Sequence, residues 1–209
     1  MRTRFRARTG VRAVAAALLV AAATAQAATP AQAQSARPGM LTVADLPPDD
    51  LTWQGGASDQ PGGSFDTRCL ADWNRPSVPE ENIWSADFLT SETASAYERV
   101  YVLPTEAEAI ALADSARQYY AGCAGRQQAQ YPGDVVTGQD HGTVDVEEGA
   151  TVGGIHLKYV TTWSGHVDVL YGVGRDGNTV ALVEWESNWT QPDVLAFKET
   201  VRAAVNRLY

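Results

Sequence analysis

The sequence predicts an α+β fold in which an antiparallel β-sheet, arranged as a meander, is flanked by two main α-helices and carries one disulfide. The segment from residue 143 to residue 186 contains several runs of Val, Tyr and Leu that are separated by Gly-containing turns, as in a meander. Two other stretches carry apolar residues at helical spacing. The chain has only two cysteines. These observations predict a single domain over residues 41–209.

The N-terminal segment has the pattern of a secretory signal peptide. Five arginines come before an apolar run at residues 14–23, and two small-x-small cleavage sites end at Ala27 and Ala33. We therefore expect residues 1–33 to be removed and the protein to be secreted. The alternative, an uncleaved membrane anchor, would need about 20 apolar residues. No cysteine lies near either site, so no lipobox is present.

The charge of the expected mature chain limits its partners. Of the 16 Lys and Arg residues, five lie within residues 1–33, which leaves 11 against 25 Asp and Glu and a net charge of −14. Nucleic acids and anionic lipid surfaces bind through clustered cations, so neither partner is expected. The acidity has two interpretations: solubility outside the cell, or attraction of a basic partner.

The cysteines Cys69 and Cys123 form an even pair in a protein expected outside the cell. This context favours one disulfide. Closing so long a loop would stabilise the fold by roughly 4 kcal/mol in the chain-entropy model. Two buried or reactive thiols are the alternative.

The N-terminal third is expected to be largely irregular. Residues 34–40 predict a disordered leader because they offer little to bury, and residues 41–48 are apolar enough to dock. Residues 54–64 are rich in Gly, Asp, Ser and Pro, which is typical of an exposed loop. Three tryptophans in this region are expected to pack into the core: Trp53, Trp73 and Trp84.

A strand at residues 97–103 and a helix that follows it are predicted next. Thr105 and Glu108 have capping-box spacing, and Gly125 is a plausible terminator. One helix face is expected to carry Ile110, Ala113, Arg117 and Tyr120, with Ala116 and Cys123 beside it. The polar residues 126–142 indicate a connection.

The meander is expected to contain strands near residues 144–146, 156–162, 167–174 and 179–186. Ser164-Gly165 and Asp176-Gly177 have the composition of two-residue hairpin loops. If Trp163 pairs with His166, four residues share one sheet face: Tyr159, Trp163, Asp168 and Trp185. Both faces are substantially apolar, so both are expected to be partly covered.

A terminal helix closes the chain. Thr190 and Asp193 have capping-box spacing, and Pro192 lies in the first turn. Its apolar residues recur at helical spacing: Val194, Phe197, Val201, Ala204, Val205 and Leu208. This stripe is expected to be buried against the sheet.

Tyr159, Trp163, Asp168 and Trp185 form the candidate ligand site, an apolar cleft with one polar group. Ordinary core packing, with Asp168 at the solvent edge, is the alternative. Ser164, His166 and Asp168 have the residue types of a hydrolase triad, but they lie within five residues across a turn, so no triad is expected. The three histidines are scattered in the sequence without metal-ligand spacing, and no metal or other cofactor is expected.

Several segments together resemble a known family. They are the docking segment Leu41–Pro47, the helix end Tyr119–Gly125, the meander rich in Val and Trp, and the terminal amphipathic helix. This pattern is similar to the extracellular sensor domain of mycobacterial PknH-type serine/threonine kinases, which also occurs in stand-alone secreted proteins and lipoproteins of actinobacteria. The resemblance covers roughly residues 40–208. It implies an antiparallel sheet with helices around a ligand cleft. Family domains often have two disulfides, whereas this chain has cysteines for one.

The sequence therefore predicts a secreted, non-enzymatic sensor domain. It would bind a small molecule or a cell-envelope component in a cleft near Trp163 and Trp185. A protein-interaction module with an acidic surface is the alternative, and a secreted hydrolase with an unrecognised site is a third possibility.

Overall fold

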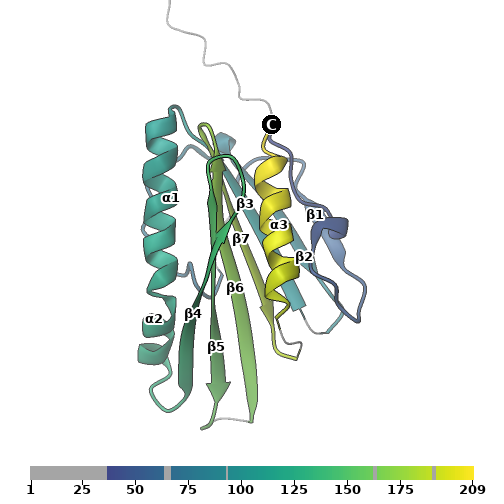
Figure 1. Cartoon of the computed structure of the whole chain (residues 1–209), viewed down its shortest axis with the longest axis vertical. Coiled ribbons are helices and arrows are strands. Elements are labelled where there is room, and N and C mark those ends of the chain that lie inside the picture. The colour runs from purple at the N-terminus through teal and green to yellow at the C-terminus, as the bar shows by residue number, and fades with distance from the viewer. Residues whose placement is uncertain (1–36, 64–66, 93, 162–163, 190–191) are drawn as a thin grey trace, which may run out of the picture. The chain divides into compact units, whose positions relative to one another are not determined.

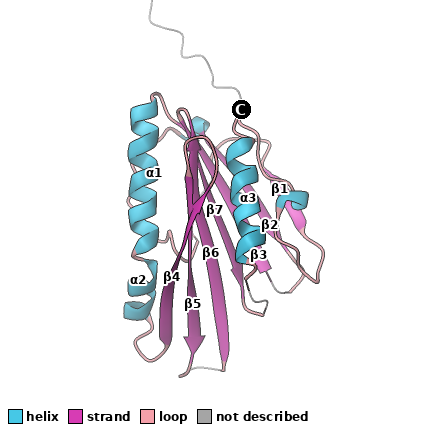
Figure 2. Cartoon of the chain, in the orientation of Figure 1, coloured by secondary structure: helices cyan, strands magenta, loops and turns pink. Residues whose placement is uncertain are grey.

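The computed structural model describes residues 37–63, 67–92, 94–161, 164–189 and 192–209. It confirms the α+β fold class, with a seven-stranded antiparallel sheet in the order β1-β2-β3-β7-β6-β5-β4 (Figures 1 and 2). The strands are β1 (Gln54–Ala57), β2 (Ile83–Leu89), β3 (Ala94–Val102), β4 (Val135–Val144), β5 (Ala150–Tyr159), β6 (Gly165–Asp176) and β7 (Thr179–Ser187). The α-helices are α1 (Glu106–Ala121), α2 (Cys123–Gln130) and α3 (Val194–Asn206).

Helices cover both faces of the sheet, as the apolar character of both faces predicts (Figure 1). The helix α3 packs on one face, in a core cluster that includes Phe197 and Trp185. The helices α1 and α2 pack on the other face with Leu182 and the disulfide. Strand β7 lies between these two layers and is buried on both sides. No helix in the described part of the chain is long and apolar enough to cross a membrane.

The first helix begins as predicted and ends differently. The Thr105 hydroxyl accepts the Glu108 N–H at 3.2 Å, which caps the N-terminus of α1. Helical structure continues past Gly125, and the expected single helix is divided at Gly122 into α1 and α2. Ile110, which was expected to share a helix face with Ala113 and Tyr120, is 40% exposed, whereas those two residues are buried. The buried stripe of α1 consists of Ala109, Leu112, Ala113, Ala116 and Tyr120.

Three strands lie where the sequence predicts irregular structure. The loop expected at residues 54–64 contains β1, and the connection expected at residues 126–142 contains part of α2 and most of β4. Both strands lie at sheet edges and are largely exposed, so burial imposes no apolar alternation on them. The strand β2 does carry buried residues, but its Ser and Asp interrupt the apolar pattern. These predictions of irregular structure were therefore wrong.

The two predicted hairpins differ from the observed ones. Asp176 pairs with Thr179, so the two-residue turn is Gly177-Asn178; this moves the register by two residues and keeps every side chain on its predicted face. Between β5 and β6, Tyr159 pairs with Gly165, and the turn is five residues long. The Asp134 carboxylate accepts the Val160 and Thr161 N–H groups at 2.8 and 3.2 Å, which holds these residues in the loop.

The terminal helix α3 is docked as predicted. Asp193 caps it by accepting the Ala196 N–H at 2.9 Å, while Thr190 lies outside the described residues. Val201 lies directly over Gly172 of β6, where a Cβ atom would come within 2.3 Å of Val201 Cγ2. A glycine at this position therefore sets how closely α3 approaches the sheet.

The free edge of β4 is partly closed by side chains. Gln128 of α2 accepts the outward-facing Val136 N–H at 3.1 Å, and the Asp140 carboxylate accepts the Gly142 N–H at 2.8 Å beside a register shift. Outward-facing groups alternate along a strand. The uncapped part of this edge is therefore centred on Gly138–Asp140.

Replacing Val201 by Asp should destabilise the protein by about 3 kcal/mol or more, because the variant puts a carboxylate into an apolar contact. Leu195 lies on the same helix and is 76% exposed, so the L195D control should change stability by less than about 0.5 kcal/mol. Urea denaturation of both variants measures the difference. Equal stabilities would contradict the docking of α3.

Candidate functional site

The structure separates the four residues that were expected to form one cleft. Trp185 and Asp168 do share the α3 face, because Leu170 pairs with Trp185 and Asp168 with Ser187. Trp185 is 3% exposed and belongs to the core. Tyr159 lies on the opposite face, where its ring meets Tyr131 edge-on at 6.1 Å. Trp163 lies outside the described residues.

The position of Tyr159 follows from the longer β5–β6 turn. A two-residue turn at Ser164-Gly165 would have placed Tyr159 and Asp168 on one face, whereas the observed register pairs Asp168 with His156. His156 Nδ1 lies 2.7 Å from Asp168 Oδ1, and His166 Nε2 lies 3.4 Å from Asp168 Oδ2. In the described part of the chain, no group of three or more His, Cys, Asp or Glu residues is placed to hold a metal ion.

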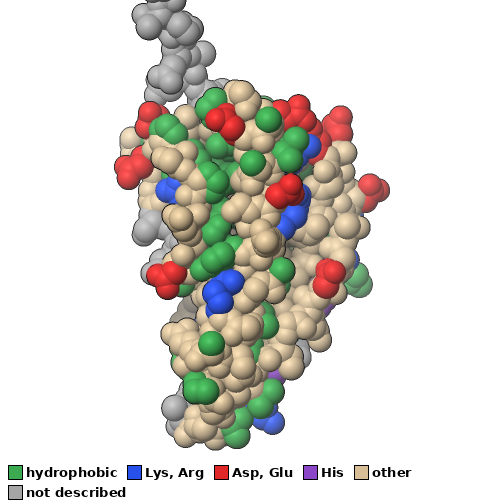
Figure 3. Space-filling view, turned by 90° about the vertical axis from the view of Figure 1, so that its left-hand side faces the viewer, with side chains coloured by type: hydrophobic (Ala, Val, Ile, Leu, Met, Phe, Trp, Pro, Cys, Tyr) green, Lys and Arg blue, Asp and Glu red, His purple; other side chains and the backbone are tan. Residues whose placement is uncertain are grey.

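A groove lies on the other face of the sheet, between the helices α1 and α2 and the strands β4, β5 and β6. Its volume is about 420 Å³, within the usual range for small-molecule sites. Figure 3 views the molecule from the side on which α1 and α2 lie. Hydrophobic side chains run down the middle of this view, and carboxylates lie mainly in the upper part of the view. The lining residues are Arg117, Tyr120, Ala121, Ala124, Gly138, Gln139, Asp140, Thr151, Val152, Gly153, Tyr171 and Val173.

Two stacked tyrosines form the inner part of the groove. The rings of Tyr120 and Tyr171 are 4.5 Å apart and 9° from parallel. Tyr171 lies across Gly153 of the neighbouring strand, where a Cβ atom would come within 2.6 Å of its ring. Gly153 therefore allows Tyr171 to lie flat beside β5 and to stack on α1. Burial raises the pKa of the Tyr171 phenol, which keeps it neutral at physiological pH.

Arg117 supplies the positive charge of the groove. Its Nη1 donates to Asp114 Oδ1 at 2.9 Å, and its Nε is buried without an acceptor among the described residues. A guanidinium offers five N–H donors, so Arg117 retains donors for a ligand. Asp140 lines the groove from β4 and supplies a negative charge. The groove thus combines an aromatic interior with one cation and one anion.

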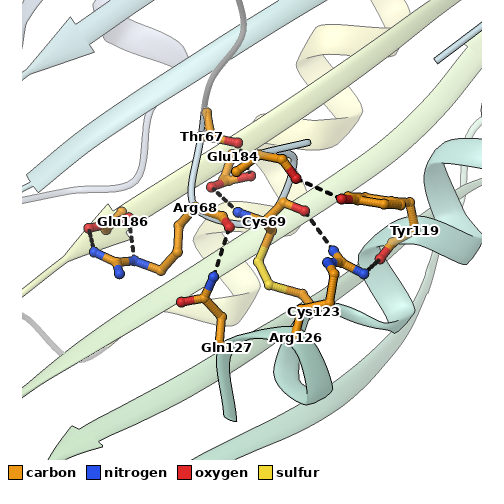
Figure 4. Close-up of a disulfide and its surroundings, with 10 residues drawn as sticks. Thr67, Arg68, Cys69, Tyr119, Cys123, Arg126, Gln127, Glu184 and Glu186 are labelled. Atoms are coloured by element: carbon orange, nitrogen blue, oxygen red, sulfur yellow. Dashed lines mark hydrogen bonds and ion pairs between the residues drawn. A yellow bond between two sulfur atoms is a disulfide. The ribbon is translucent and has the colours of Figure 1, made fainter. Parts of the chain in front are cut away.

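The helical wall of the groove is fixed by the Cys69–Cys123 disulfide, which confirms the predicted pairing (Figure 4). Around it, Arg126 donates to the Cys69 carbonyl at 2.9 Å and to the Tyr119 carbonyl at 2.8 Å. Gln127 donates to the Arg68 carbonyl at 3.1 Å. The segment at residues 67–69 is therefore attached to both α1 and α2, next to the groove.

Glu184 of β7 is fully buried beneath this segment (Figure 4). Its carboxylate accepts the Thr67 hydroxyl at 2.6 Å and lies 3.5 Å from the Cys69 N–H. Burial raises the pKa of Glu184 to about 7, although these hydrogen bonds oppose the rise. The neighbouring Glu186 instead forms a two-point ion pair with Arg68, at 2.8 and 3.0 Å.

A second buried glutamate lies on the α3 face. Glu98 of β3 accepts the Leu41 N–H at 2.7 Å, so the N-terminal segment docks there as predicted. Glu98 is 0% exposed, and burial raises its pKa to about 8. Both glutamates hold segments that come from outside the central sheet.

Sequence reasoning placed Arg117 and Tyr120 on one helix face but did not identify this groove. Tyr171 and Gly153 complete the groove, and they meet the helix only through strand pairing over long sequence separations.

No family model, curated protein or solved structure matches this chain.

The stability of the protein should fall as the pH rises from about 4.5 to about 8. The pKa of a glutamate in the unfolded chain is 4.5, whereas in the folded protein the pKa is about 7 for Glu184 and about 8 for Glu98. Over this interval the folded state therefore retains protons that the unfolded state has lost. The E184Q variant keeps an acceptor for Thr67 but cannot ionise, so its unfolding free energy should fall less, by a difference on the order of a few kcal/mol at pH 8. Urea denaturation across this pH range tests it. The exposed Glu81 provides the control E81Q, which should behave like the wild type. If the unfolding free energy of E184Q falls with pH as steeply as that of the wild type, Glu184 does not have a raised pKa in the folded protein.

Replacing Gly153 by Ala should destabilise the protein by about 1–3 kcal/mol, because the new methyl group collides with the Tyr171 ring. The control G125A lies in α2, where a Cβ atom meets nothing within 4 Å, and should be neutral or stabilising by up to about 1 kcal/mol. Thermal unfolding and near-UV circular dichroism of the tyrosines measure both effects. A stable G153A protein with an unchanged tyrosine signal would show that the stack does not depend on this glycine.

Proposed function

We propose that this protein is a secreted, non-enzymatic ligand-binding domain whose binding site is the groove between α1, α2 and strands β4–β6. The observation that carries the proposal is the open groove with the Tyr120–Tyr171 stack inside it and the partly unpaired Arg117 guanidinium at its wall. These features suit a small amphipathic molecule with a planar apolar part and an anionic group.

The ligand-binding role is supported by the chemistry of the lining. Among the described lining residues there is no histidine or cysteine, and the polar groups suit hydrogen bonding and charge pairing. The half-buried ring of Tyr171, which is held in place by its stack on the buried Tyr120, offers a rigid apolar surface that a ligand can contact at low entropic cost. The proposal keeps the expected function but moves the site from Trp163 and Trp185 to the opposite face of the sheet.

Secretion and sensor-domain character are part of the same proposal. The signal-peptide pattern at residues 1–33 supports export, and a disulfide is stable in the oxidising environment outside the cell. The resemblance to the PknH-type sensor domain implies a sheet with helices around a ligand cleft. The groove is the cavity of this structure that we assign to that role.

The probe 8-anilinonaphthalene-1-sulfonate has a planar aromatic part and one anionic group, so it should bind the groove of the folded protein. The variant R117Q should weaken its binding by about tenfold, since a charge-assisted hydrogen bond is lost. Fluorescence titration gives the dissociation constant, and amide chemical shifts should change around Gly138 and Gly153.

The control R202Q removes an arginine that also pairs with an acidic residue three positions earlier, on α3. It should bind the probe like the wild type. Equal losses in both variants, or shift changes confined to other surfaces, would argue against the groove.

A further inference from the structure

All lysines and histidines of the chain lie on one surface. The sequence contains two lysines, Lys158 and Lys198, and three histidines, His141, His156 and His166. They are dispersed over 58 positions of sequence. In the fold they come from β4, β5, β6 and α3, on the sheet face that carries α3. The sequence interpretation of the histidines as scattered therefore does not hold in three dimensions.

Strand pairing brings four of the polar side chains together. His156 pairs with Asp168, and Lys158 pairs with His166; cross-strand partners project from the same face of a sheet. The imidazole rings of His156 and His166 are 5.4 Å apart, with the Asp168 carboxylate within 2.7 and 3.4 Å of their nitrogens. The Asp168 side chain is 6% exposed, whereas those of His156 and His166 are 40% and 30% exposed. The histidines are therefore accessible, and the carboxylate lies beneath them.

His141 and Lys198 extend this surface across β4 and α3. His141 Nε2 lies 3.4 Å from the position of a Cβ atom on Gly154, which projects from the same face as His156. Burial, and after it the nearby positive charge of Lys198, lower the pKa of the His141 imidazole.

We propose that this cationic patch, formed by His141, His156, Lys158, His166 and Lys198, binds a linear phosphate-bearing polyanion at mildly acidic pH. The cations come from three strands, about 5 Å apart, and a helix, so one small anion cannot contact them all, whereas successive charges of a polymer can. The expected mature chain has a net charge of −14, which repels polyanions from the rest of the surface.

The charge of the patch depends on pH. Counting Lys158, Lys198 and Asp168, it is +1 when the histidines are neutral and +4 when all three are protonated. Imidazoles acquire their charge as the pH falls through about 6.5. For His141, burial and Lys198 oppose the charged form, whereas Asp140 favours it. Binding should therefore strengthen as the pH falls.

Binding of fluorescently labelled inorganic polyphosphate, measured by anisotropy at constant ionic strength, tests the proposal. Affinity should be at least about tenfold higher at about pH 5.5 than at about pH 7.5. The K158Q variant changes an exposed side chain, so it should fold normally and weaken binding about threefold or more at the lower pH. H156Q should reduce the difference between the two pH values.

The groove variant R117Q is the matched control, since it removes one cation from the opposite face and should leave polyphosphate binding unchanged. Conversely, K158Q should leave binding of the naphthalene sulfonate unchanged, so the patch and the groove can fail separately. Affinity that does not change with pH, or an R117Q loss as large as that of K158Q, would overturn the proposal. Tighter binding of an oligothymidylate of equal charge would also overturn it, by assigning the patch to nucleic acid.

Discussion

The burial of β7 on both faces is the constraint on which the rest of the structure depends. A central strand with apolar residues on both sides needs a layer over each, so α3 must lie on one face and α1 with α2 on the other. The same burial encloses Glu184, whose carboxylate has to find partners within the protein. Thr67 and Cys69 provide them, and the disulfide joins this segment to α2. One buried strand thus connects the helical layer, the loop before it and the cross-link.

The covering layers leave the outer strands β4, β5 and β6 partly accessible on both faces, and both proposed surfaces lie there. On the α1 side, Gly153 and Tyr171 leave space for a groove. On the α3 side, the paired positions of β5 and β6 carry His156, Lys158 and His166 instead of apolar residues. Alternation along β5 and β6 separates the two surfaces by the thickness of the sheet. A ligand in the groove and a polymer on the patch would therefore contact different side chains of the same strands.

Periodicity and turn composition in the sequence were sufficient to predict the fold class, the terminal helix and the cores of β3, β5, β6 and β7, and the even number of cysteines predicted the disulfide. Each helix or strand among them buries a stripe or a face, so the spacing of its apolar residues indicates its secondary structure. The edge strands β1 and β4 are held by pairing and bury little, and their composition is that of a loop. The predicted candidate site depended on the register between β5 and β6. The observed register differs from the predicted one because the loop between these strands is longer, and Asp134 binds two backbone N–H groups of that loop. In the observed register, Tyr159 and Asp168 lie on opposite faces of the sheet, and His156 pairs with Asp168. The spacing of these residues along the chain does not predict this pairing.

The capped edge of β4 bears on how the protein behaves at high concentration. An open edge strand offers a row of unpaired amides on which another chain can grow, and a ten-residue strand at the end of a seven-stranded sheet would be a long template. The side chains of Gln128 and Asp140 accept the N–H groups of Val136 and Gly142, which lie on either side of the uncapped stretch. The register shift next to Gly142 also bends the strand. The uninterrupted stretch is shorter than the six or seven residues typical of self-associating β-segments. The β4 edge can therefore face solvent while it offers only a short stretch on which another copy of the chain could pair.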